Sequence, residues 1–132
     1  MSQFKVKAVM FDLDGTLIHT APEIASAANQ MLADLGRPIL PYQQIESYIG
    51  EGAQVLIKRC LCGKRDMEPE PALFEQGQTL FYHYYAVNAQ ESKPFDGVIT
   101  GLYALENKGM KMACVTNKPE KFTLPLLKNS GL

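Results

Sequence analysis

Two kinds of hydrophobic pattern alternate along this chain. Residues 8–11 are continuously apolar and residues 110–116 form a second, largely apolar run, which indicates two strands buried on both faces, as in a parallel sheet. Between and after these runs, apolar residues recur at the three- and four-residue spacing of helices. The predicted order is therefore strand, helical insertion, helix, strand, helix, which is typical of an α/β protein.

The predicted helices carry start and stop signals. Thr20–Glu23 has the S/T-x-x-E form of a capping box, and Gly36, followed by Arg37 and Pro38, ends the first helix. Further helices are expected after Pro41 and over about 53–62, 73–85, 98–108 and 119–131. Residues 20–90 therefore read as a small helical bundle.

Composition excludes some classes of protein. The 132 residues are 46% hydrophobic and 20% charged, with a formal net charge of -1, which is typical of a globular protein. Without a run of basic residues, nucleic acid is not an expected partner. No stretch approaches the roughly 20 apolar residues of a membrane span, and residues 1–5 pass directly into the first strand without a signal peptide. We therefore expect no membrane association and a cytoplasmic protein.

Two carboxylates follow the first predicted strand. Asp12 and Asp14 start on the same side of an extended chain, and Gly15 allows a sharp turn away from the sheet. Ligands of open α/β sheets bind at this end of the strands. Like charges so close together favour a hard divalent cation such as Mg²⁺. One aspartate could form an aspartyl-phosphate while the other protonates a leaving alcohol. An isolated Asp-x-Asp would more simply be a turn, but the whole run of residues 11–17 after a strand is more specific.

A second polar group follows the second strand. A strand-end hydroxyl from Thr116, the Lys118 ammonium and the N–H groups of the next helix would together suit a phosphate. Taken alone, such a Thr-Asn sequence before Pro119 is commonly only a helix cap. The presence of Asp12 after the other strand makes a phosphate site the stronger interpretation of this segment.

Other polar residues have simpler explanations. His19 could contact a substrate, although a polar residue beside a helix start is the simpler interpretation, and His83 reads as a packing residue. Arg59 and its basic neighbours could attract an anion, yet a solvated helix end explains them as well. The Gly50–Gly52 segment separates two helices.

These residues together carry a resemblance to a known family. Asp12–Thr16 (Asp-Leu-Asp-Gly-Thr) resembles the first motif of the haloacid dehalogenase superfamily, and Thr116 occupies the place of its second-motif Ser/Thr. Within that superfamily the chain resembles the phosphoglycolate phosphatases over essentially its whole length, in four further segments: 20–24, 48–52, 94–98 and 115–119.

The resemblance implies a fold and a division of the chain. The expected fold is a partial Rossmann-like core of the haloacid dehalogenase type with an inserted all-helical cap. Residues 1–17 and 93–132 would form the core, and residues 18–92 would form the cap. The family continues through a third motif with a lysine and a fourth with acidic magnesium ligands, neither of which is found here. We therefore expect the N-terminal part of a longer protein, truncated after the second motif and with little activity of its own.

The resemblance also implies a reaction and roles. Asp12 would be the nucleophile and a Mg²⁺ ligand, and Asp14 the general acid and base, with its backbone carbonyl on the metal. Thr116, Asn117 and Lys118 would hold the phosphoryl group. Gly50, Glu51 and Gly52 would face the substrate from the cap. The expected reaction is hydrolysis of 2-phosphoglycolate, a small phosphorylated metabolite, to glycolate and phosphate.

Other functions stay open at this point. Family members commonly carry Asp where this chain has His19, so another capped phosphatase of the superfamily, or a sugar-phosphate mutase, remains an alternative. A second alternative is a non-catalytic interaction module that associates with itself through exposed strand edges.

Overall fold

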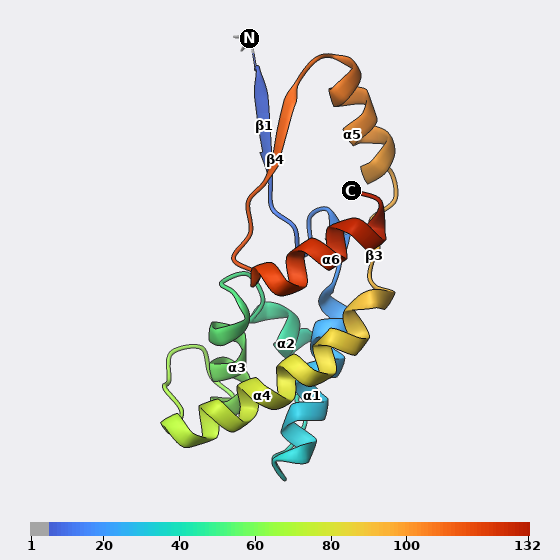
Figure 1. Ribbon diagram of the computed structural model, residues 1–132. Helices are drawn as coiled ribbons and strands as arrows, with labels where there is room; N and C mark the ends of the chain where they lie inside the picture. Colours follow the sequence, from blue (N-terminus) through green and yellow to red (C-terminus); the bar gives the residue numbers. More distant parts are fainter. Residues whose placement is uncertain (1–5) are drawn as a thin grey trace.

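The structure, a computed structural model, describes residues 6–132 as two parts with a helix between them (Figure 1). One part is a small parallel sheet with α5, and the other is the bundle α1–α4; α6 lies between them. In chain order, the elements are β1 (Ala8–Phe11), β2 (Ile18–His19), α1 (Ala21–Asp34), α2 (Tyr42–Ser47), α3 (Ala53–Cys62), α4 (Pro71–Asn88), the 3₁₀ turn η1 (Ala89–Glu91), β3 (Lys93–Pro94), α5 (Val98–Asn107), β4 (Lys111–Cys114) and α6 (Glu120–Ser130).

The first and second predicted strands lie side by side and run in the same direction. β1 pairs with β4 in parallel, from Ala8 opposite Lys111 to Phe11 opposite Cys114. Because parallel neighbours end at the same edge of a sheet, the segments after Phe11 and after Cys114 leave the sheet together. The predicted α/β order is confirmed, and it brings both candidate polar segments to one place.

The burial predicted for these strands is wrong for the part of the chain that the structure describes. Met10 is 74% exposed and Val115, just beyond β4, is 58% exposed. Each strand has a hydrogen-bonded neighbour on one side only. α5 contributes no buried residue. A parallel sheet buries its strands when further strands and helices cover both edges and both faces, and two strands alone leave apolar surface open.

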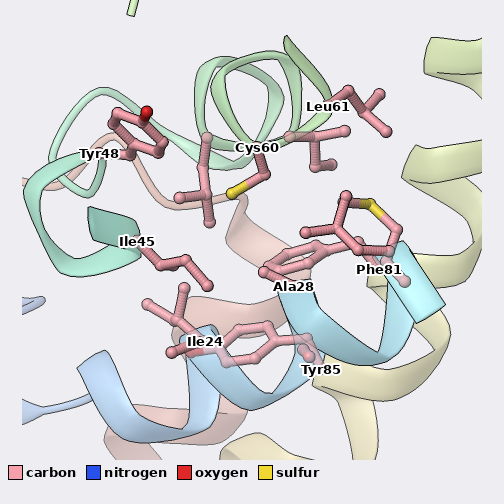
Figure 2. Packing of buried hydrophobic residues seen from close by; sticks show 14 of the residues in the cluster. Ile24, Ala28, Ile45, Tyr48, Cys60, Leu61, Phe81 and Tyr85 are labelled. Carbon is pink, nitrogen blue, oxygen red and sulfur yellow. The ribbon is translucent and has the colours of Figure 1, made fainter. Parts of the chain in front are cut away.

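The bundle α1–α4 has a continuous hydrophobic core (Figure 2). The α1 stripe expected from the sequence is buried, with Ala27, Ala28 and Met31 fully enclosed. The small alanines let α4 approach closely, and Phe81 and Tyr85 of α4 stack with ring centres 5.6 Å apart. Figure 2 shows these rings beside Ala28 and Ile24 of α1.

A short two-stranded ribbon joins the bundle to the rest. β2 pairs antiparallel with β3, with Ile18 opposite Pro94 and His19 opposite Lys93. The chain enters the predicted cap, residues 18–92, through β2 and leaves it at β3, so the two connections to the predicted core run side by side. We did not expect these strands from the sequence, because two residues are too few to show an alternating pattern.

Helix ends follow the sequence signals with one exception. α6 starts after Pro119 and ends at Gly131, whose φ of 81° is the left-handed conformation of a helix C-terminus. The predicted capping box at α1 is wrong: Thr20 precedes the helix, but its side chain does not bond the helix N–H groups. Its hydroxyl donates instead to Asp14 Oδ1 at 2.8 Å. Within residues 6–132, no helix is both long and apolar enough to cross a membrane.

Candidate active site

A tight turn after β1 presents the two aspartates. Leu13 and Ile18 are fully buried and anchor the turn in a second, smaller core with Leu126 of α6. The Leu13 carbonyl accepts hydrogen bonds from Leu17 N–H at 3.0 Å and Ile18 N–H at 3.2 Å. Gly15 permits this reversal with a φ of 77°. Since Leu13 is buried between Asp12 and Asp14, both carboxylates lie at the edge of the core.

All of the predicted site residues except Glu51 line one pocket. It lies between the turn after β1, the segment after β4 and the inner face of the bundle, and it is lined by Asp12, Asp14, Ile24, Ile49, Gly50, Gly52, Ala53, Leu56, Phe81, Tyr85, Thr116, Asn117, Lys118, Pro119 and Phe122. Its polar side chains come mainly from the sheet side. Its bundle side is mostly apolar, with one hydroxyl from Tyr85 and the backbone of two glycines.

The two aspartates have different environments. Asp12 is exposed, and its Oδ1 accepts a hydrogen bond from Leu13 N–H at 2.8 Å. Asp14 is held from two sides, by the Thr20 hydroxyl at 2.8 Å and by Lys118 Nζ at 3.0 and 3.3 Å from its two oxygens. Asp12 is therefore open to a ligand, whereas Asp14 is fixed in orientation.

Lys118 is the buried cation of the pocket. Its side chain is 4% exposed, and its Nζ also lies 4.4 Å from the centre of the Tyr85 ring. Burial lowers the pKa of Lys118, and the ion pair with Asp14 opposes that shift. The turn that carries it is shaped by Thr116, whose Oγ1 accepts a hydrogen bond from the Lys118 N–H at 3.1 Å.

Tyr85 is a site residue that the sequence did not reveal. Its pKa is raised, first by burial and then by the negative charges of Asp14 and Glu23, so its hydroxyl stays protonated. That hydroxyl is buried and has no hydrogen-bond partner among the described residues. The sequence placed Tyr85 on the apolar stripe of α4, but nothing in the pattern showed that this stripe extends under Lys118.

The cap loop, residues 50–52, reaches the segment after β4. Asn117 Nδ2 donates to the Gly50 carbonyl at 2.9 Å. Gly52 has a φ of 95°, and a Cβ placed on it would lie 2.9 Å from the Asn117 carbonyl oxygen. Gly50 and Gly52 line the pocket, while Glu51 is not among its lining residues and pairs with Arg59 of α3. Asn117 thus joins the sheet side of the pocket to the bundle.

Other candidates lie outside the pocket. His19 is exposed, and its ring packs against Phe95 at 5.0 Å between ring centres. His83 is exposed on α4 against Tyr84. Arg59, interpreted from the sequence as part of a solvated helix end, is buried.

The oxygen ligands of the pocket suit the metal that the sequence implies. Asp12 supplies carboxylate oxygens and Asp14 a backbone carbonyl oxygen, and both are kinds of ligand that suit Mg²⁺. Among residues 6–132, no group of three or more His, Cys, Asp or Glu side chains gathers in a way that could hold a metal. The two aspartates therefore fit part of a magnesium site, in which water and a phosphate would supply further oxygens.

Comparison with known proteins places the chain in a family. The sequence model described as "Haloacid dehalogenase-like hydrolase" matches residues 9–132. The chain belongs to this family.

Its named relatives are phosphoglycolate phosphatases. The chain is 51% identical over 128 residues to the phosphoglycolate phosphatase of Thiobacillus denitrificans and 48% identical to that of Nitrosospira multiformis, in each case over 96% of this chain and 56% of the relative. A solved structure of a predicted phosphoglycolate phosphatase from Haemophilus somnus 129PT superposes with a TM-score of 0.88 at 33% identity, covering 98% of this chain and 60% of that one. The chain thus spans little more than half the length of these relatives.

Proposed function

We propose that the protein containing this chain hydrolyses a small phosphomonoester, 2-phosphoglycolate, to glycolate and phosphate. The observation that carries the proposal is the pocket in which an open carboxylate, Asp12, lies beside the ion pair between Asp14 and the buried Lys118, at the ends of two parallel strands. The names of the relatives support the choice of substrate. Residues 1–17 and 93–132 act as the core and residues 18–92 as the cap.

Each side chain has a separate task in the proposed reaction. A carboxylate oxygen of Asp12 attacks phosphorus, so that the ester P–O bond breaks and an aspartyl-phosphate forms. Asp14 gives a proton to the leaving glycolate oxygen and later takes one from the water that attacks phosphorus. That second step releases phosphate and restores Asp12.

Lys118 changes partner during the proposed cycle. In the free protein it pairs with Asp14. An incoming phosphoryl group competes for the ammonium, and Lys118 then pairs with the phosphoryl oxygens in place of Asp14. Thr116 contributes its hydroxyl to the same oxygens. Asp12 and the Asp14 carbonyl would hold Mg²⁺, which would supply positive charge to offset the negative charge of the carboxylates and the phosphate.

The test is an assay of the native protein, whose intact mass also establishes its length. We expect magnesium-dependent release of phosphate from 2-phosphoglycolate, and loss of that release by a factor of about 10³ or more in Asp12→Asn, which keeps the shape of the side chain but is a poor nucleophile. A protein consisting only of residues 1–132 should give little turnover. Unchanged activity in Asp12→Asn would refute the proposed mechanism.

A substrate panel distinguishes 2-phosphoglycolate hydrolysis from the other activities of the superfamily. The apolar bundle side of the pocket, with Ile24, Leu56 and Phe81, would also admit other compact esters. Comparable kcat/KM for a sugar phosphate or a nucleotide would assign a different capped phosphatase, and phosphate transfer between sugar hydroxyls would assign a mutase.

A further inference from the structure

A buried arginine contacts the chain just before the cap loop and within it. Arg59 lies in the last turn of α3, and its side chain is 8% exposed. Its Nη1 donates to the Tyr48 carbonyl at 3.1 Å, before the cap loop, and its Nη2 pairs with the carboxylate of Glu51 within it. The Glu51 side chain is 61% exposed, so the ion pair joins a buried guanidinium to a carboxylate at the surface. One rigid side chain thus fixes two points that are three residues apart.

The same loop contacts the sheet side of the pocket, at the segment after β4 that is proposed to bind phosphate. Gly50 accepts the hydrogen bond from Asn117, and the Gly52 backbone lies directly against the Asn117 carbonyl. Asn117 stands between Thr116 and Lys118. A continuous set of contacts therefore runs from Arg59, through the cap loop, to the segment that carries the pocket's cation.

We propose that Arg59 is a positioning residue that fixes the cap loop in the shape that engages Asn117. This inference rests on the proposed function, because it assigns the cap-loop contact to the site where phosphate binds. The planar guanidinium can bond the Tyr48 carbonyl and the Glu51 carboxylate at once with fixed geometry. A lysine ammonium on its shorter, flexible stem cannot hold both partners in that way.

A purely structural role for Arg59 makes a different prediction. If Arg59 only stabilised the bundle, its loss would lower the stability of α1–α4 but leave the Asn117 side chain unaffected. If Arg59 positions the loop, the Asn117 side chain loses its partner although it lies on another element. The Asn117 side-chain amide is therefore the informative reporter.

The test follows that amide by ¹⁵N NMR in the native protein without substrate. Arg59→Met keeps a long apolar stem and removes both bonds. Arg37→Met is the control, because Arg37 also donates to a backbone carbonyl, that of Leu61 in α3 at 2.8 Å, and this bond lies outside the cap loop. We expect hydrogen exchange of the Asn117 side-chain amide to be about tenfold faster in Arg59→Met and unchanged in Arg37→Met.

Two results would overturn the proposal: no acceleration in Arg59→Met while circular dichroism shows intact helices, or equal acceleration in both variants. If Arg59→Met does not fold, Arg59→Lys takes its place, since it keeps the charge but loses one of the two bonds, and the same outcomes apply. Because no turnover is measured, a negative result leaves the proposed phosphatase activity untouched. Equally, an inactive protein could still show the positioning effect.

Discussion

Replacing Gly52 with alanine tests the contact between the cap loop and Asn117. The backbone of Gly52 has a φ of 95° and a ψ of 168°, a combination that L residues avoid, at a cost of about 1–3 kcal/mol. The new Cβ would lie 2.9 Å from the Asn117 carbonyl oxygen, so one segment must move. That movement breaks the Gly50–Asn117 hydrogen bond, with a net contribution of about 0.5–1.5 kcal/mol. Together, these two effects should lower the free energy of unfolding by about 1.5–4.5 kcal/mol.

The assay is urea unfolding of the native protein, followed by circular dichroism. Gly63→Ala is the matched control: Gly63 ends the same helix with a φ of 66°, and a Cβ there meets no atom within 4 Å. It should cost about 1–2 kcal/mol from backbone strain alone. If Gly52→Ala is no more destabilising than Gly63→Ala, the reasoning about the loop contact is refuted.

Three further predictions concern the ion pair, its neighbour and the open sheet. Burial lowers the pKa of Lys118, so its ammonium is lost at a lower pH than that of an ordinary lysine, and affinity for inorganic phosphate should fall from that pH upward. In a calorimetric titration Lys118→Arg should abolish this fall, because arginine stays charged. Identical pH profiles for the variant and the unmodified protein would contradict the prediction. Thr20→Val removes the hydroxyl that binds Asp14 and should lower the free energy of unfolding by about 1.5–3 kcal/mol, against less than about 0.5 kcal/mol for the exposed Thr79→Val. The 132-residue chain should associate through its open strands in sedimentation experiments, and Met10→Lys should weaken this; a monomer at all concentrations would argue against it.

The sequence predicted the parts of the site that follow strands. Asp12, Asp14 and Lys118 were expected near each other because each lies within four residues of the end of a predicted parallel strand, and parallel strands end at one edge of a sheet. Local pattern was sufficient for this, because the pairing of the two strands follows from their order. The roles given to these residues stay predictions.

The contacts between distant segments could not be predicted in this way. Thr20 had the spacing of a helix cap, yet its hydroxyl binds a carboxylate that the turn after β1 brings to it. Arg59 had the sequence context of a surface residue, and its burial depends on how the loop between α2 and α3 folds back over α3. Such side chains respond to tertiary packing, which overrides local preference.

Phe122 makes the packing of the bundle α1–α4 depend on a residue outside it. This ring belongs to α6, but it packs against Tyr82 and Tyr85 of α4, with ring centres 5.1 Å apart in each case. Four residues later, Leu126 of the same helix enters the smaller core beside the turn after β1. A bundle cut out at residues 18–92 would lack this ring and expose the aromatic surface of Tyr82 and Tyr85 to water. A design that uses the bundle on another scaffold must therefore replace Phe122 with another apolar side chain.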